Sequence, residues 1–245
     1  MDQQVQRAYE QYSKQPDDLA KNTFLTSMKE QNEVLYFKVR ILTRASLYRS
    51  LVRACSGSNT FLQLLHDHLE EMFSVVYTPT EGDAIQNYSR GFRRPEGVFL
   101  NIHDIDRVHH DLSRWGRPED IDYIVVTDGE EILGIGDQGC GGILISIAKL
   151  VLTTICAGIH PNRVLPVGLD CGTDNKELLN DPLYLGLREK RVRGEQYDKL
   201  VDTFVTAARE LYPNAYIHFE DFGLHNGEFR WGYNNEREPI ANTSA

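Results

Sequence analysis

The stretch DYIVVTDGEEILGIGDQGCGGILISIAKLVLTTICAGIH, residues 122–160, decides the fold class of this chain. It opens with a β-branched apolar run, residues 123–126, that predicts a buried strand. A glycine-rich turn follows, and residues 143–152 then form a second apolar run, long enough for a helix that is buried on most sides. A strand, a turn and a buried helix in this order favour an α/β fold with a parallel sheet.

Lys149 is the one charged residue within the second apolar run. Burying an ammonium group costs several kcal/mol, roughly, unless the group is paired or loses its proton. A lysine that gives up its proton in such surroundings suits the role of a general base. A salt-bridged or snorkelling lysine explains the pattern equally well, and the residues alone leave both interpretations open.

The alternation of strand and helix continues to the end of the regular sequence. Residues 164–170 and 215–221 predict two further strands, and residues 196–212 predict the helix between them. Parallel sheets bind ligands at the carboxyl ends of their strands, where Asp128, Asp170, Glu220 and Asp221 lie. Glu220 and Asp221 offer neighbouring oxygen ligands to Mg²⁺ or Mn²⁺, although an exposed acidic strand end explains the same pair.

The first hundred residues have a different character and are predicted to be mainly helical. Residues 2–39 show helical periodicity with a break at residues 15–18. Residues 40–63 contain several arginines and no acid, which indicates an insertion or, as the weaker reading, a membrane-surface helix. Pro79 biases its neighbour toward an extended conformation, so that Tyr77 is held at a turn and either faces a cleft or packs half-buried.

These patterns predict three regions. A helical region covers residues 1–100 and includes the insertion at about 40–63. A parallel α/β domain for substrate and metal covers residues 101–227, and an irregular tail covers residues 228–245.

Composition narrows the functional classes. Asp and Glu number 36 against 26 Lys and Arg, a net charge of −10, which argues against nucleic-acid binding because that needs a basic face. No apolar run reaches the roughly 18 residues of a membrane span, and the N-terminus does not have the pattern of a targeting peptide. The four cysteines are widely spaced, as in reduced proteins. We expect a protein of the cytoplasm or mitochondrial matrix, with neither nucleic acid nor membrane as partner.

Residues 134–139, GIGDQG, match the glycine fingerprint of dinucleotide-binding folds. Two observations count against this reading. Asp137 places a carboxylate in the loop that would hold a pyrophosphate, and the candidate ribose-binding acid, Asp170, comes about 30 residues later instead of the usual ~20. We therefore predict that this chain contributes no cofactor-binding residues here.

Four long segments resemble the N-terminal part of malic enzymes. They are VVYTPTEGDAIQNYSRGFRRPEGVFLNI (75–102), IVVTDGEEILGIGDQGCGGILISIAKLVLTTICAGIHPNRVLPVGLDCGTDN (124–175), DPLYLGLREKRVRGEQYD (181–198) and IHFEDFGLHN (217–226). Apart from the insertion, the likeness covers nearly all of residues 2–226. It implies the conversion of malate to pyruvate and CO₂ with reduction of NAD or NADP and with Mg²⁺ or Mn²⁺.

The resemblance also implies roles for single residues. Lys149 matches the lysine that takes the proton from the C2 hydroxyl, and Tyr77 matches the tyrosine that protonates the enolpyruvate at C3. Glu220 and Asp221 match two of the three metal carboxylates of the family. These roles agree with general acid–base chemistry beside a cation that polarises the substrate.

The chain departs from the family pattern at three points. A third metal aspartate and a Rossmann domain for NAD(P) do not follow residue 226, Glu131 stands where many members carry an arginine for a malate carboxylate, and residues 40–63 interrupt a segment that the family has continuous. We therefore expect a truncated or mis-spliced product that does not turn over malate alone and that self-associates into homo-oligomers through exposed apolar surface. The alternative is a non-catalytic, dicarboxylate-binding or regulatory partner of a full-length malic enzyme.

Overall fold

Two units make up the chain, Met1–Ala84 and Ile85–Ala245. The computed structural model describes residues 7, 10–20, 23–24, 77, 79–90, 96–160, 163–223 and 241–242. In the first unit, residues 10–13 and 18–20 are helical, with a break between them at the predicted place. Asp17 begins the second of these helices, because its Oδ1 accepts a hydrogen bond from the backbone N of Ala20 at 2.7 Å. The predicted insertion at 40–63 lies outside the described residues.

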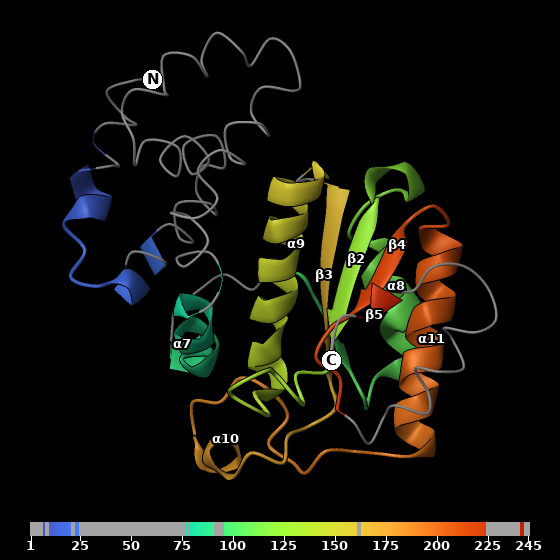
Figure 1. Ribbon diagram of the computed structural model, residues 1–245. Coiled ribbons are helices and arrows are strands. Elements are labelled where there is room, and N and C mark those ends of the chain that lie inside the picture. Colours follow the sequence, from blue (N-terminus) through green and yellow to red (C-terminus); the bar gives the residue numbers. More distant parts are fainter. Residues whose placement is uncertain are drawn as a thin grey trace, which may run out of the picture. The chain divides into compact units, whose positions relative to one another are not determined.

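A parallel sheet forms the centre of the second unit (Figure 1). Its strands lie in the order β1-β3-β2-β4-β5, and every neighbouring pair is parallel. This confirms the predicted α/β fold with a parallel sheet. The strands are β1 (Val98–Asn101), β2 (Tyr123–Thr127), β3 (Val164–Asp170), β4 (Tyr216–Phe219) and β5 (Ala241–Asn242).

Helices cover both faces of this sheet. Helix α9 packs on β2 and β3, while α8 and α11 pack together on the opposite face, as Figure 1 shows. The α-helices are α7 (Thr80–Gln86), α8 (Val108–Ser113), α9 (Ile143–Ala157), α10 (Lys176–Asn180) and α11 (Glu195–Leu211). The short 3₁₀ helices are η1 (Tyr88–Arg90), η2 (Ile105–Arg107), η3 (Pro118–Asp120) and η4 (Gly139–Gly142).

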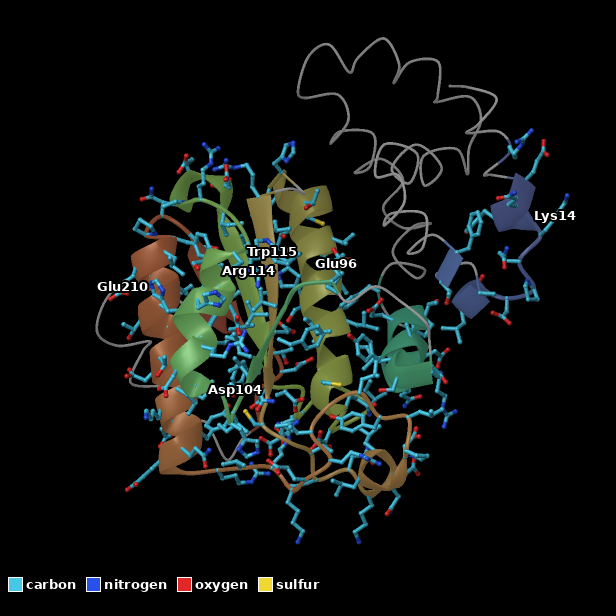
Figure 2. All side chains as sticks on the ribbon, turned by 180° about the vertical axis from the view of Figure 1, so that it is seen from behind. Lys14, Glu96, Asp104, Arg114, Trp115 and Glu210 are labelled. Carbon is cyan, nitrogen blue, oxygen red and sulfur yellow. The ribbon has the colours of Figure 1, made fainter. Side chains whose placement is uncertain are left out.

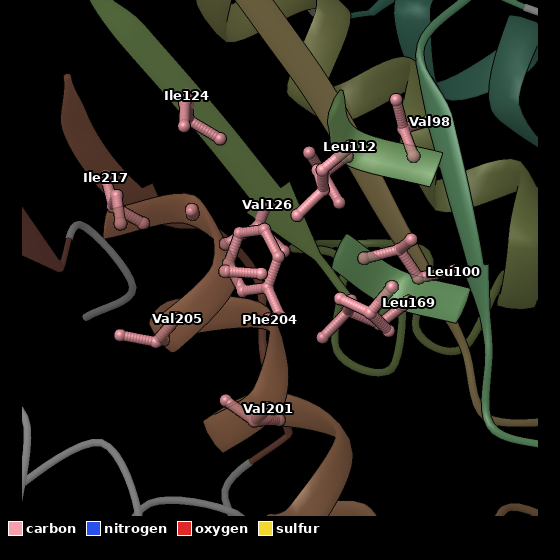
Figure 3. Close-up of a cluster of buried hydrophobic side chains, with 14 of the residues drawn as sticks. Val98, Leu100, Leu112, Ile124, Val126, Leu169, Val201, Phe204, Val205 and Ile217 are labelled. Atoms are coloured by element: carbon pink, nitrogen blue, oxygen red, sulfur yellow. The ribbon is translucent and has the colours of Figure 1, made fainter. Parts of the chain in front are cut away.

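The main core lies between the sheet and helices α8 and α11 (Figure 3). Alternate side chains of a strand point to opposite faces of the sheet. Ile124 and Val126 of β2 point into this core, where they join Leu112 of α8 and Phe204 of α11. Tyr123 and Val125, which alternate with them along β2, therefore face α9. Charged side chains such as Glu210 lie on the exposed side of α11 (Figure 2).

Helix α9 is buried on most of its sides, as its composition predicts. Ile143, Leu144, Ile145 and Ala148 are all less than a tenth exposed. The helix ends at Gly158, whose φ of 74° is the left-handed conformation that commonly terminates helices. A helix enclosed in this way brings Lys149 close to the sheet.

Two short strands differ from the sequence-based regions. β1 starts at Val98, inside the region predicted to be helical to residue 100. β5 lies in the predicted irregular tail, where Ala241 pairs with His218 of β4; the rest of residues 228–245 lies outside the described part. Both are edge strands of two to four residues, and so short a run carries little sequence periodicity.

The connections after β2 and β3 leave toward opposite faces of the sheet, to α9 and α11 respectively (Figure 1). In parallel sheets this arrangement opens a crevice at the carboxyl ends of the strands. In the part of the chain that is described, no helix is long and apolar enough to cross a membrane. The described cysteines, Cys140, Cys156 and Cys171, are all free thiols.

Candidate active site

Lys149 and Glu220 form an ion pair between helix α9 and the end of strand β4. Lys149 Nζ lies 3.1 Å from Glu220 Oε1. The Glu220 side chain is 3% exposed and the Lys149 side chain 20%, so the charge on the helix and the charge on the strand compensate each other in a largely dry setting. Of the two sequence interpretations of Lys149, the salt-bridged one describes this geometry.

A histidine extends the pair along the same face of the sheet. His218 Nε2 lies 2.8 Å from Glu220 Oε2, and His218 Nδ1 lies 2.9 Å from the Tyr123 hydroxyl. His218 is two residues before Glu220, so both side chains point toward α9. The sequence patterns did not indicate His218 or Tyr123 as site residues. The alternation of residues 215–221 does, however, place His218 on the same face of the strand as Glu220.

Asp221 follows directly and is held in an unusual backbone conformation. Its φ of 51° is the one left-handed value among the described non-glycine residues, and aspartate tolerates this conformation better than most residues. The residue is 7% exposed. Burial and the negative charge of Glu220 together raise the pKa of Asp221 to about 6, against the opposing charge of Lys149.

The adjacent carboxylates fit the donor set of a hard divalent cation. Both are buried, which is not the exposed acidic strand end that the sequence also allowed. Carboxylate oxygens are the ligands that Mg²⁺ and Mn²⁺ prefer, and a cation beside the pair would offset the cost of burying the charge of Asp221. Within the described residues no group of three or more His, Cys, Asp or Glu side chains is arranged to hold a metal ion. The pair would supply only part of the ligands that such an ion takes.

Glu131 lies beside this acidic pair. Its backbone N donates a hydrogen bond to the backbone O of Asp221 at 3.3 Å. The Glu131 side chain is exposed. The loop after β2 thus brings to Asp221 the position at which the resemblance implies an arginine.

The loop between β2 and α9 is organised around the carboxylate of Asp137. Arg191 donates to it from Nε at 2.8 Å and from Nη2 at 2.9 Å. The hydroxyl of Thr173 and the backbone N of Gly139 also donate to it, at 2.8 and 2.9 Å. Burial opposes ionisation of Asp137, but these donors outweigh it and its pKa lies below the usual value. The carboxylate that argued against a pyrophosphate loop is thus bound to the protein itself.

Arg191 also connects this loop to the end of β2. Its Nη2 donates to the backbone O of Asp128 at 2.9 Å, and its side chain is 1% exposed. The Asp128 carboxylate accepts a hydrogen bond from the Tyr197 hydroxyl at 2.7 Å. Burial raises the pKa of Asp128 more than the charge of Arg191 and the Tyr197 hydrogen bond lower it. Asp128 therefore lies at the predicted strand end but serves to hold the loops together.

Asp170 has a similar structural role at the end of β3. It accepts hydrogen bonds from the backbone N of Leu187 at 2.9 Å and of Gly172 at 3.3 Å. Burial raises its pKa. Of the four acids predicted at the strand ends, Glu220 and Asp221 form the candidate ligand pair, and Asp128 and Asp170 position the surrounding loops.

Glycines in this region allow two backbones to meet. A Cβ on Gly142 would lie 2.6 Å from the Cα of Gly129, and Gly129 itself has a φ of 66°. Any side chain at either position would separate the end of β2 from the start of α9. This packing explains Gly129 and Gly142, which flank the fingerprint at residues 134–139.

Tyr77 belongs to the first unit and is half-buried. It precedes helix α7, and its backbone O accepts a hydrogen bond from the backbone N of Glu81 at 2.8 Å. The predicted turn at Tyr77 and Pro79 therefore introduces a helix. Its relation to Lys149, which belongs to the second unit, stays a prediction.

The fold and the site define a parallel α/β domain with a buried lysine and two adjacent acids at the carboxyl ends of its strands. The family described as "Malic enzyme, N-terminal domain" matches residues 56–229. The chain therefore belongs to the malic enzyme family, as its resemblance implied.

Curated relatives agree with this assignment. The chain is 47% identical over 226 residues to the mitochondrial NAD-dependent malic enzyme of Saccharomyces cerevisiae, covering 92% of this chain and 30% of that one. It is 49% identical over 227 residues to NAD-dependent malic enzyme 3 of Bacillus subtilis, covering 92% and 36%. The NAD-dependent malic enzyme of Schizosaccharomyces pombe is 44% identical over 231 residues, with coverage of 93% and 36%. The chain thus spans about a third of the length of the curated relatives it matches.

Proposed function

We propose that this chain forms the substrate and metal portion of a malic enzyme, whose reaction is the oxidative decarboxylation of malate to pyruvate and CO₂ with reduction of NAD(P). One observation carries the proposal: Lys149 Nζ lies 3.1 Å from Glu220 Oε1. This contact joins the proposed base to a proposed metal ligand in one buried cluster. Membership of the malic enzyme family supports it.

In this proposal Lys149 first gives up its own ammonium proton to solvent and then, as a neutral amine, accepts the proton of the malate C2 hydroxyl. The lysine comes from a rigid, buried helix, and Glu220 holds its Nζ in place, so the group is positioned before substrate arrives. Its side chain remains 20% exposed, so it is not sealed within the core. Tyr77 would supply a proton to C3 of the enolpyruvate after loss of CO₂.

Glu220 and Asp221 would hold a Mg²⁺ or Mn²⁺ ion. When bound, the cation would polarise the substrate oxygen and stabilise developing negative charge. Asp221 has a left-handed backbone conformation, and the backbone of Glu131 hydrogen-bonds to it. Residues that are strained in this way often occur at functional sites.

We do not assign an NAD-binding role to residues 134–139, because Asp137 is bound there by Arg191. We propose that these 245 residues bind malate with a cation but do not turn malate over by themselves. Oxidation of malate by the purified chain, measured as reduction of NAD or NADP at a rate comparable to that of full-length malic enzymes, would contradict this part.

Calorimetric titration with Mn²⁺, with and without malate, tests the binding proposal. We compare wild type with Asp221→Asn, because asparagine tolerates the left-handed backbone and removes only the charge. Malate-dependent Mn²⁺ binding that is lost in Asp221→Asn supports the proposal. Absence of Mn²⁺ binding in wild type, or equal binding in the variant, overturns the metal assignment.

A second candidate function is a non-catalytic partner of a full-length malic enzyme, or of a second copy of this chain. The supporting observation is apolar exposure in the loops at the carboxyl ends of the strands: Leu133 is 85% exposed, Leu183 63% and Leu185 67%. Sedimentation of the chain alone and with a full-length relative distinguishes these states. Replacement of the three leucines with serine should abolish any association.

The named relatives are consistent with the cytoplasm of bacteria or with mitochondria as the compartment.

A further inference from the structure

Three polar contacts run in series through the layer between the sheet and α9. The Tyr123 hydroxyl lies 2.9 Å from His218 Nδ1, His218 Nε2 lies 2.8 Å from Glu220 Oε2, and Glu220 Oε1 lies 3.1 Å from Lys149 Nζ. Tyr123 lies opposite Tyr216 in the β2–β4 register, four residues before Glu220. At about 3.3 Å per residue the series spans roughly 13 Å along the strands.

The contacts determine which atom donates in each hydrogen bond. The carboxylate of Glu220 accepts only, so Nε2 of His218 carries the hydrogen and donates. In a neutral imidazole the other nitrogen, Nδ1, then accepts from the Tyr123 hydroxyl. The hydroxyl keeps its proton because burial raises the pKa of Tyr123 to about 12. Glu220 thus selects the tautomer in which His218 Nε2 donates, and the Tyr123 hydroxyl satisfies Nδ1 by donating to it.

The backbone holds this arrangement firmly. His218 and Tyr123 lie on neighbouring parallel strands, with His218 opposite Val125. His218 is 5% exposed and Glu220 2%, so neither side chain has room to turn away. One oxygen of Glu220 is bound by His218 and the other by Lys149, which sets the plane of the carboxylate.

Resting on the proposed function of this site, we propose that His218, held by Tyr123, is a positioning residue that orients the Glu220 carboxylate toward Lys149 and the cation. A buried polar series is costly to desolvate, and an apolar residue at 218 would pack on α9 without that cost. Partners of this kind orient metal-ligating side chains, and their loss typically weakens metal binding by about 10- to 100-fold.

The experiment uses the full 245-residue chain and measures Mn²⁺ affinity with malate present. His218→Leu should weaken Mn²⁺ binding by about 10- to 100-fold. His218→Gln keeps a donor near the position of Nε2 and should restore most of the affinity. Tyr123→Phe should have a smaller effect in the same direction. Tyr216→Phe is the matched control, because its ring stacks on Tyr123 at 5.1 Å on the neighbouring strand, and it should bind as wild type does.

Thermal unfolding of each variant separates positioning from packing. A purely structural role would lower the stability of His218→Leu and His218→Gln without changing Mn²⁺ affinity, and this result overturns the proposal. Equal affinity of His218→Leu and wild type, while Glu220→Gln binds no Mn²⁺, overturns it as well and leaves the proposed function standing.

NMR of ¹⁵N-labelled histidine decides the proposal when metal binding fails. The expected signal for His218 is a neutral ring protonated at Nε2, and Tyr123→Phe should shift its Nδ1 resonance. A ring protonated at Nδ1 overturns the orientation proposed here. If wild type does not bind Mn²⁺, the metal assignment under the proposed function is refuted. The observed tautomer of His218 then tests separately whether His218 donates to Glu220.

Discussion

Arg191 binds both carboxylate oxygens of Asp137, a residue 54 positions earlier in the chain, at 2.8 and 2.9 Å. Its remaining nitrogen, Nη1, is buried without a hydrogen-bond partner among the described residues. Breaking such a buried pair leaves an uncompensated charge, which costs about 3–5 kcal/mol. We predict a loss of this size in the free energy of unfolding for Arg191→Met, measured by urea denaturation. Arg191→Lys should lose nearly as much, because lysine cannot bind both oxygens in the same way.

The pair between Arg163 and Asp122 is the matched control. It has the same two-point geometry, with both distances 2.5 Å, but its side chains are 39% and 46% exposed. Water screens such a pair, so Arg163→Met should change stability little. The double variant Arg191→Met with Asp137→Asn should recover part of the loss. Equal effects at the buried and exposed pairs would refute the role of burial.

Lys149 and Glu220 should respond unequally to removal of a partner. Lys149→Met leaves a carboxylate that is 3% exposed without its ammonium partner, and we expect a loss of about 3–5 kcal/mol. Glu220→Gln should cost about 1–2 kcal/mol, because Lys149 is 20% exposed and its ammonium can turn toward water. Urea denaturation of both variants and of the double variant measures the coupling. The opposite order of the two losses would contradict this account.

Sequence patterns predicted the parallel sheet because its central strands are long and apolar. β2, β3, α9 and α11 lie where their apolar runs predicted them, since each buries enough side chains to show a period. The location of the acids at the ends of β2, β3 and β4 could also be predicted, because parallel strands end at a common edge of the sheet. β1 and β5 could not be predicted in this way, because these edge strands have only four and two residues.

The functions of the acids could not be separated by sequence. Asp170 ends a strand and Asp128 and Glu220 directly follow one, and their roles depend on which donors tertiary packing brings to them. Tyr197 reaches Asp128 from 69 positions away, and His218 reaches Tyr123 from 95. Local periodicity contains no information on contacts at such separations. The apolar residues around Lys149 in the sequence predicted its burial. Its partner, Glu220, could not be predicted because only the folded sheet brings the end of β4 next to α9.

Asp221 should make the stability of the metal-free protein depend on pH. Its pKa is raised from 3.8 to about 6 by burial and by Glu220, so the folded state binds this proton more tightly than the unfolded state. The resulting stabilisation is fully present below about pH 4 and is lost as the pH rises through about 6. A shift of about two units corresponds to about 2–3 kcal/mol.

Asp221→Asn removes this dependence because it mimics the protonated acid and accepts the left-handed backbone. In the presence of EDTA, we expect variant and wild type to differ little at pH 4. The variant should become more stable than wild type by about 2–3 kcal/mol at pH 7.5. Urea unfolding at intervals of pH measures the difference between the two proteins, in which other titrating groups cancel. A difference that stays constant from pH 4 to 7.5 would show that Asp221 keeps its ordinary pKa.

The negative charge of Glu131 should weaken the binding of malate, and reversal of this charge in Glu131→Arg should strengthen it. Its backbone N donates to the backbone O of Asp221 at 3.3 Å, and its side chain is exposed. Malate carries two negative charges, which a third carboxylate at this edge repels. Glu131→Arg turns this repulsion into attraction, and at separations of about 6 Å we expect malate to bind about tenfold tighter or more. Glu131→Gln should give part of this gain.

Calorimetry with malate and Mn²⁺ measures the effect, and Glu210→Arg is the control for net charge. Glu210 lies on the exposed side of α11 (Figure 2), so its reversal changes the total charge equally but not the field at the strand ends. The gain from Glu131→Arg should also shrink as salt rises toward 1 M, because an exposed charge is screened over a Debye length of about 3 Å at that concentration. An equal gain from both reversals would attribute the effect to net charge, and no gain at Glu131 would place malate away from this loop.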